Sequence, residues 1–280
     1  MRQIKVDLIE QAVAKAVIDA NTVLPKDVQG ALQAARERET LPAARRFLQI
    51  ILENADIACR DRMALCQDCG MVVVHVKLGQ EVHLIGGDLE AAINRGISTG
   101  YQRGYLRKSI VKDPLTRVNT GDNTPAIVHI SLVAGDALQL TIMPKGAGSE
   151  NMGQLTMLKP SAGVEGVKEF ILQVVRAAGG NPCPPVIVGV GIGGNMEKAA
   201  LLAKHALLRE VGQNNERQDL AELEMEMLAR INATGIGVMG IGGNTTALAV
   251  NIETYPTHIA CLPVAVNLGC HSTRRLTLEF

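Results

Sequence analysis

Apolar residues recur at helical spacing over the first sixty positions of the chain. Residues 41–60 repeat a pattern that begins in residues 4–24. The apolar positions of the first stretch are Ile9, Val13, Ala16, Val17 and Ala20. A period near 3.6 residues is typical of a helix with one buried face. We therefore predict that the N-terminal sixty residues are mostly helical.

The pattern then changes to the short period of strands. Residues 71–79, MVVVHVKLG, are rich in β-branched side chains, and such a run favours a strand. Residues 89–105 return to helical periodicity. Residues 126–146 hold two alternating apolar runs about a Gly-Asp turn, which is typical of a hairpin. We expect these two runs to pair with each other.

The second half of the chain alternates between the two patterns. A helix is predicted over 163–180, because glycines follow its apolar stripe and glycine closes a helix easily. A strand over 185–191 and helices over 196–209 and 219–233 come next, before glycine- and valine-rich strands. This order, with a hairpin within it, predicts a mixed α/β (α+β) fold of helices around mixed sheets, in one domain over 1–280.

One short sequence occurs twice. GIGGN stands at 191–195 and again at 240–244, each time after an apolar stretch. It could mark a two-fold internal pseudo-repeat. Equally, glycine turns recur by chance in a chain with 28 glycines.

Composition and charge narrow the class of function. The chain has 280 residues, 47% of them apolar, with 28 basic and 28 acidic side chains. Balanced charge provides no basic surface for nucleic acid or an anionic membrane, so small-molecule chemistry is favoured. The N-terminus does not resemble a signal peptide and no apolar run reaches membrane-spanning length. We expect a cytoplasmic protein whose six cysteines are thiols or metal ligands.

A glycine pattern raises the possibility of dinucleotide binding. Gly189, Gly191 and Gly194 form G-x-G-x-x-G between a predicted strand and a predicted helix. A dinucleotide site also needs a second strand ending in an acid after that helix, and the polar segment 209–218 does not predict one. We therefore interpret these glycines as turn residues.

The segment 65–70, LCQDCG, raises three alternatives for its two cysteines. A structural zinc site usually draws on a second closely spaced pair, and the other cysteines stand alone in the sequence. A thioredoxin-like pair opens a helix after a strand, whereas here the order is helix, loop, strand. The remaining alternative is a metal centre gathered from distant single cysteines, such as an iron–sulfur cluster with one open iron.

The other cysteines divide into two groups. Cys183, between prolines in NPCPP, and Cys270, at a predicted strand end in GCHSTRR, are typical of ligands on loops. Cys59 follows the helical stripe of Ile51 and Ala55, and Cys261 lies within a predicted apolar strand. We expect these last two to be small buried hydrophobic residues.

Several motifs together resemble one enzyme family. They are CQD-x-G, NTG-x-N-x-P-A, KG-x-GSEN, CPP and LPVAVN-x-x-C-x-x-x-R, between about residues 50 and 275. In this order they resemble the iron–sulfur hydro-lyases of the class I fumarase and L-tartrate dehydratase group. More narrowly, the chain resembles the alpha subunit of the two-subunit fumarate hydratases, and KGAGSEN (145–151) is closer to the fumarase pattern.

The resemblance implies a four-iron, four-sulfur (4Fe-4S) cluster and a set of site residues. The implied cluster ligands are Cys66, Cys183 and Cys270. The implied substrate-binding residues are Gln67, Arg107, Gly146 and His258. Asp68 is implied as an acid–base or substrate-orienting group, the alternative being that it caps its loop. The family usually has threonine or a similar residue at the position of Cys69, which leaves that thiol outside the ligand set.

The resemblance also implies a reaction and a partner. It implies reversible hydration of fumarate to L-malate, a step of the tricarboxylic acid cycle, or alternatively dehydration of L-tartrate to oxaloacetate. Single-chain members continue into a second domain, so we expect a separate beta subunit to supply further substrate-binding residues in a symmetric hetero-oligomer. A non-catalytic cluster carrier or redox sensor is a further alternative.

Overall fold

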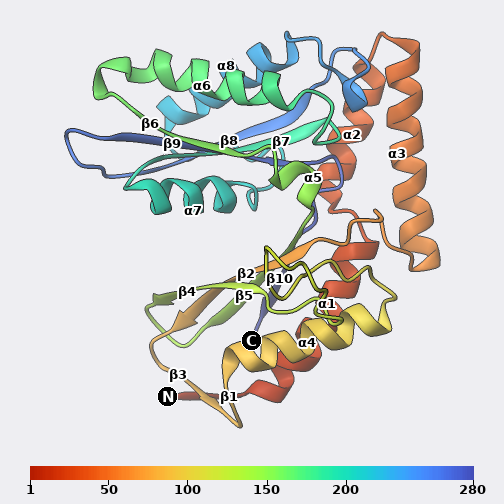
Figure 1. The fold of residues 1–280 in the computed structure, drawn as a ribbon, viewed down its shortest axis with the longest axis vertical. Helices are drawn as coiled ribbons and strands as arrows, with labels where there is room; N and C mark the ends of the chain where they lie inside the picture. The colour runs from red at the N-terminus through yellow and green to blue at the C-terminus, as the bar shows by residue number, and fades with distance from the viewer. The chain divides into compact units, whose positions relative to one another are not determined.

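The computed structural model describes residues 1–280, which fold into two compact units (Figure 1). Unit 1 comprises Met1–Leu24, Asn54–Ala147 and Arg274–Phe280, and unit 2 comprises Pro25–Glu53 and Gly148–Thr273. Each unit has helices packed on a sheet of mixed strand direction, so the predicted mixed α/β fold is confirmed. The expectation of one domain over 1–280 stays a prediction.

Unit 1 is built on a four-stranded sheet in the order β10-β5-β2-β4. The strands are β2 (Met71–Gly79), β4 (Ile127–Val133), β5 (Leu138–Lys145) and β10 (Leu276–Glu279). Helices α1 (Val6–Thr22) and α4 (Leu89–Arg103) cover one face of this sheet (Figure 1). A short parallel pair, β1 (Arg2–Lys5) and β3 (Val82–Ile85), stands apart from the sheet. Alternate β2 residues, beginning at Val72, point into this core, as the β-branched run predicted.

Two glycines allow α1 and α4 to pack closely. A Cβ added at Gly100 would lie 2.2 Å from the Val17 Cγ2 atom, and one added at Gly96 would lie 2.6 Å from the Glu10 carbonyl oxygen. Real Cβ atoms do not approach other atoms so closely, so the helix spacing requires glycine at both positions. The interface buries the α1 stripe of Ile9, Val13 and Val17 that the sequence predicted.

The predicted hairpin over 126–146 is wrong. Both strands form, as β4 and β5, but β2 lies between them and pairs with β4 in parallel and with β5 antiparallel. The connecting turn binds the end of β2 instead of closing a hairpin, because Gly79 N–H donates to the Ala137 carbonyl at 2.8 Å and Glu81 N–H to the Gly135 carbonyl at 3.0 Å. Pairing with a strand fifty residues earlier is invisible to a local turn signal.

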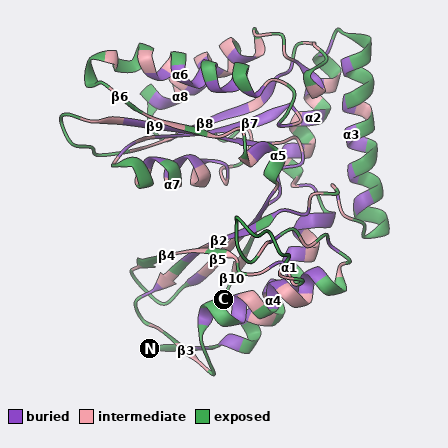
Figure 2. Cartoon of the chain, in the orientation of Figure 1, coloured by how far each residue is buried: buried purple, intermediate pink, exposed green.

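Unit 2 has a second four-stranded sheet, in the order β6-β9-β7-β8. Its strands are β6 (Gln154–Leu158), β7 (Val186–Gly193), β8 (Ala247–Tyr255) and β9 (Leu262–Gly269). Helices α6 (Gly163–Ala178) and α8 (Gln218–Asn232) cover one face and α7 (Met196–Ala206) covers the other (Figure 1). Figure 2 shows β7 and β9 buried almost throughout, as expected for strands covered on both faces.

The remaining elements complete the two units. Unit 2 also holds α2 (Lys26–Arg38) and the first part of α3 (Pro42–Asp61), whose last part belongs to unit 1. The short helix α5 (Ala147–Glu150) and the 3-10 turns η1 (Pro160–Ala162) and η2 (Val238–Gly240) connect strands and helices. No helix in the structure combines the length and apolarity needed to cross a bilayer.

The glycines of G-x-G-x-x-G serve helix packing. A Cβ at Gly189 would lie 2.2 Å from the Ala203 carbonyl oxygen, and one at Gly191 would lie 2.1 Å from that of Ala199. These two glycines let α7 lie directly on β7. The interpretation of Gly189 and Gly191 as turn residues is therefore wrong, because both lie inside β7, where the close approach of α7 excludes a side chain. The two GIGGN sequences occupy different local structures, since Asn195 caps α7 whereas Asn244 follows η2 and precedes β8.

Candidate functional site

The loop 66–70 connects the end of α3 to β2 in unit 1, as predicted. Cys66 is half-buried in this loop, and the main-chain N–H of Asp68 lies 3.4 Å from its Sγ atom. Gln67 is exposed. Polar hydrogens directed at cysteine sulfurs are a feature of protein iron–sulfur sites. A half-buried Cys66 with such a contact therefore fits a metal-binding cysteine.

The Asp68 carboxylate is held by two main-chain donors. Its Oδ1 atom accepts the Gly70 N–H at 2.9 Å, and its Oδ2 atom accepts the Ala147 N–H at 2.7 Å. The loop-capping alternative is therefore present in the geometry. A carboxylate has about four acceptor positions, so two remain for a ligand. A Cβ at Gly146 would lie 3.1 Å from Asp68 Oδ2, so a bare main chain at this position keeps the carboxylate accessible.

Gly70 is fixed by its surroundings. Its φ of 77° lies in the left-handed region, and an added Cβ would lie 2.8 Å from three main-chain atoms of Lys145. Glycine is therefore required on grounds of both conformation and space. This contact sets the loop directly against the end of β5.

Three buried side chains hold the carbonyl groups of the loop. Arg274 Nη1 donates to the Asp68 carbonyl at 2.9 Å and the Tyr101 hydroxyl donates to the Cys69 carbonyl at 2.6 Å. The Gly70 carbonyl accepts from Asn123 Nδ2 at 3.1 Å and lies 3.2 Å from the Tyr101 hydroxyl. We call Tyr101, Asn123 and Arg274 the carbonyl clamp.

Sequence reasoning assigned no role to the carbonyl clamp. Asn123 lies in NTG-x-N-x-P-A and Arg274 in C-x-x-x-R, so both motifs carried a signal that was not used. Tyr101 lies within the predicted helix and had no such signal. Asn119, at the start of the same motif as Asn123, shapes a neighbouring turn by accepting the Gly121 N–H at 2.7 Å.

Cys69 occupies a setting different from that of Cys66. It is 1% exposed in the core of unit 1, and burial raises the pKa of its thiol, although the Arg107 N–H donates to its sulfur at 3.2 Å. A buried thiol with a raised pKa stays neutral and packs as a small hydrophobic group. Through this bond Cys69 fixes the main chain of Arg107, whose side chain is exposed.

Unit 2 brings the loops of Cys183 and Cys270 together. The Cys183 carbonyl accepts the His271 N–H at 3.3 Å and lies 2.9 Å from its Nδ1 atom. Cys270 Sγ lies 3.3 Å from the Ser272 hydroxyl, and both cysteines are half-buried and on loops, as predicted. His271 was missed, and its only sequence signal was its position next to Cys270.

The residues fit thiolate ligation, with the three predicted ligands divided between the units. Cys66 belongs to unit 1, and Cys183 and Cys270 belong to unit 2. None of the cysteines forms a disulfide. Neither unit alone gathers three histidine, cysteine or carboxylate side chains that could hold a metal ion.

The other predicted residues have simpler surroundings. His258 lies in an exposed turn before β9, where its Nδ1 atom accepts the Ala260 N–H at 3.2 Å. The expectation that Cys59 is buried is wrong, because Ala58 takes the buried position on α3 and Cys59 is exposed. Cys261 is likewise half-buried at the start of β9 and not inside the strand, because the chain turns there.

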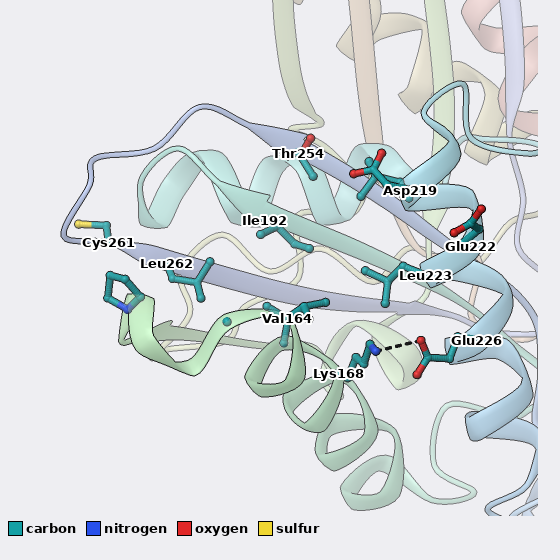
Figure 3. Close-up of a pocket in the computed structure, with 14 residues that line it drawn as sticks. Val164, Lys168, Ile192, Asp219, Glu222, Leu223, Glu226, Thr254, Cys261 and Leu262 are labelled. Carbon is teal, nitrogen blue, oxygen red and sulfur yellow. Dashed lines mark ion pairs between the residues drawn. The ribbon is translucent and has the colours of Figure 1, made fainter.

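A pocket in unit 2 contains none of the predicted site residues. It has a volume of about 590 Å³ and lies between α6, α8 and the ends of β7 and β9 (Figure 3). Its wall is apolar, with side chains such as Ile192 and Leu223, and an ion pair at 2.9 Å joins Lys168 to Glu226. Cys261 lies at one end of it. The predicted site residues therefore lie on loops outside this pocket.

Comparison with known proteins identifies the family. A sequence model described as Fumarate hydratase (Fumerase) matches residues 10–279. A protein of Methanocaldococcus jannaschii named "Putative L(+)-tartrate dehydratase subunit alpha" is 41% identical over 274 residues, 95% of each chain. The protein named L(+)-tartrate dehydratase subunit alpha in Escherichia coli K12 is 31% identical over 281 residues, 99% of this chain and 92% of the relative. The chain therefore belongs to the fumarate hydratase (Fumerase) family, whose members are hydro-lyases.

Proposed function

We propose that the chain is the alpha subunit of a hydro-lyase that interconverts fumarate and L-malate. The observation that carries this proposal is the loop 66–70. It presents the half-buried Cys66 thiol beside an Asp68 carboxylate whose direction is fixed by two main-chain N–H groups. The family match over residues 10–279 supports a hydro-lyase, and the KGAGSEN segment supports fumarate as the substrate.

The proposed cofactor is a 4Fe-4S cluster held by Cys66, Cys183 and Cys270. Such a cluster with three protein thiolates supplies a cationic iron that can stabilise the hydroxide leaving malate. The half-buried loop positions of the three cysteines support this assignment. So do the polar contacts at two of the sulfurs: the Asp68 N–H is directed at Cys66 Sγ, and the Ser272 hydroxyl lies 3.3 Å from Cys270 Sγ.

The chain's own residues would bind the substrate and move its proton. Removal of water from malate needs a base for the proton on the carbon next to the hydroxyl-bearing carbon. We propose Asp68 for this base or for orienting the substrate, since its carboxylate has acceptor positions left. Arg107 would bind a substrate carboxylate through two parallel hydrogen bonds.

Three further residues would shape the substrate site. Gln67 is exposed next to Asp68 and can donate or accept a hydrogen bond. Gly146 leaves room for close approach at the Asp68 carboxylate. His258 is a proposed contributor by resemblance, and its exposed turn leaves its Nε2 atom available to solvent or a partner.

A beta subunit is the proposed partner. The relatives are named as alpha subunits, and such a name implies a beta subunit. We propose that this partner carries the remaining cationic groups for the second substrate carboxylate and that the pair assembles symmetrically.

L(+)-tartrate is the second candidate substrate, because the relatives at 41% and 31% identity are named as subunits of L(+)-tartrate dehydratase. Dehydration of tartrate uses the same elimination of water on a substrate with one more hydroxyl. The two candidates therefore share one catalytic apparatus and differ in the pocket around that hydroxyl.

The substrate test uses the chain co-expressed with its beta subunit and purified without oxygen. Initial rates are measured with fumarate, L-malate and L(+)-tartrate at equal concentrations. A kcat/KM for L-malate at least about tenfold above that for tartrate supports our proposal, since one polar group can discriminate by more than this. The reverse order establishes the second candidate, and no turnover of any of the three refutes a hydro-lyase of this class.

The cofactor test uses single cysteine variants of the same complex. We expect Cys66→Ser, Cys183→Ser and Cys270→Ser each to lower iron content sharply, and Cys69→Ser to retain it, because the buried Cys69 thiol is not a ligand. Cys59→Ser, on the exposed face of α3, is the matched control. Full iron content in any of the first three variants would contradict the ligand assignment.

A further inference from the structure

The carbonyl clamp is fully inside the protein. Tyr101 and Asn123 are 0% exposed and Arg274 is 2% exposed. Hydrogen bonds among buried groups are stronger than exposed ones, because no water competes for them. The three members come from α4, from the loop before β4 and from the segment before β10, so they fix the loop 66–70 from three directions within unit 1.

Arg274 differs from the other two members because it carries a charge. Its Nη1 atom donates to the Asp68 carbonyl and to Asn21 Oδ1, both at 2.9 Å, and its buried Nε atom has no hydrogen-bond partner. Burying a guanidinium is costly, because the charge loses its hydration. A neutral amide could hold one carbonyl at a lower cost, so a purely structural bond does not account for the charge.

The charge lies beside the proposed reaction site. A Cβ added at Gly146 would be 3.1 Å from Asp68 Oδ2 and 3.5 Å from Arg274 Nη2. The carboxylate and the guanidinium therefore face the same side of Gly146, without forming an ion pair. Arg274 thus holds the main chain of Asp68 with one nitrogen, while its Nη2 atom and the Asp68 carboxylate both border the space beside Gly146.

We propose that Arg274 is a positioning residue for the hydro-lyase reaction. It acts through Asp68, by fixing the main chain on which the carboxylate is mounted and by supplying a cation on the same side of Gly146. This inference rests on the proposed function because the chemical role of Asp68 comes from it; the fixing of the loop by Arg274 does not depend on it. A displacement of about 1 Å at a reacting group can lower a rate about a hundredfold, so loss of this bond acts mainly on kcat.

The first test measures the loop itself in the full chain and needs no activity. Hydrogen–deuterium exchange is followed in peptides that cover residues 66–72 of the wild type and of Arg274→Lys. Lysine keeps the positive charge but lacks the planar guanidinium group with its paired N–H donors. We expect exchange in this segment to become at least about tenfold faster, the effect of losing one charged hydrogen bond. The matched control is Arg95→Lys, an exposed arginine on α4 that pairs with Glu10 at 2.6 Å, and it leaves the segment unchanged.

The second test separates positioning from folding. In the complex with the beta subunit, kcat per cluster of Arg274→Lys falls at least about tenfold while KM changes less than about threefold, because substrate contacts are retained. A variant that only folds poorly has fewer active sites but a normal kcat per cluster. Tyr101→Phe keeps the ring and loses the hydroxyl that binds the Cys69 carbonyl, so it provides the same test if Arg274→Lys does not fold.

The results distinguish this inference from the proposed function. Wild-type exchange in residues 66–72 of the variants refutes the positioning role, and so does a normal kcat per cluster in an active complex. A wild-type complex that hydrates none of the dicarboxylates refutes the proposed function. The exchange experiment still decides whether Arg274 fixes the loop in that case.

Discussion

The close contact between Gly70 and the end of β5 predicts a large effect for Gly70→Ala. Alanine at a φ of 77° costs about 1–2 kcal/mol, because its Cβ meets its own carbonyl group. The same Cβ would also lie 2.8 Å from three main-chain atoms of Lys145, and overpacking of this kind costs about 1–3 kcal/mol more. We therefore expect the free energy of unfolding of unit 1 to fall by about 2–5 kcal/mol.

Gly135→Ala is the matched control for this prediction. Gly135 also has a positive φ, of 87°, and lies in unit 1, but an added Cβ would meet no atom within 4 Å. This variant should lose only the conformational part, about 1–2 kcal/mol. The difference between the two variants isolates the close approach of the loop to β5.

The assay is urea unfolding of both variants, followed by circular dichroism and by exchange in peptides of unit 1. Peptides of unit 2 report whether the transition is shared by both units, which decides whether one free energy describes it. In Gly70→Ala the amide protection of residues 66–72 should also fall, because displacement of the loop weakens the hydrogen bond from the main-chain N–H of residue 70 to Asp68 Oδ1. Equal stability of Gly70→Ala and Gly135→Ala would refute the argument from crowding.

Two further predictions concern packing and pH. Gly191→Ala should destabilise unit 2 by about 3 kcal/mol or more, because its Cβ would lie 2.1 Å from a carbonyl oxygen of α7. The control is Gly30→Ala, also in unit 2, whose Cβ meets no atom within 4 Å, and urea unfolding compares the two. Burial raises the pKa of Asp19, but the hydrogen bonds and charges of Lys15 and Arg62 outweigh this effect and lower it below the usual 3.8. The lowered pKa stabilises the fold above that value, and this stabilisation is lost as the pH falls below it. Thermal melts are recorded between pH 3 and pH 7 at intervals of roughly one pH unit. The melting temperature of Asp19→Asn should fall less in acid than that of the wild type. An equal acid dependence in the two proteins would contradict the reasoning.

Elements with a strong local period were predictable from the sequence. The stripe of Ile9, Val13 and Val17 predicted α1, and the β-branched run predicted β2 with its observed bounds. Both patterns report one buried face, which is a local property of the chain.

Pairing between distant segments was not predictable in the same way. The turn at Gly135 predicted a hairpin, yet β2 inserts between its two strands. The contribution of β10 to the same sheet was also missed, since four residues are too few to show a period. Cys59 was misassigned because it is adjacent on the helix to Ala58, and a rotation of one residue decides which of them is buried.

The predicted site residues around Asp68 were found through motifs, whereas their supports were not. Arg274 holds a carbonyl 206 positions earlier in the chain, and Tyr101 holds one 32 positions earlier. Such bonds follow from the tertiary fold and leave no periodic trace in the sequence. The role of Cys69 had a similar origin, since its sulfur accepts an N–H from Arg107, 38 positions later.

The interleaved sequence of the two units has a consequence for synthesis of the chain. Unit 1 takes its last segment from residues 274–280, which leave the ribosome only after the whole of unit 2 has been made. Until then β5 lacks its β10 neighbour and the Asp68 carbonyl lacks its Arg274 donor. Domains usually fold in the order of translation. Here the unit that begins first is completed only after unit 2 has been made, so the loop bearing Cys66 acquires its Arg274 hydrogen bond after the residues of unit 2 have been synthesised.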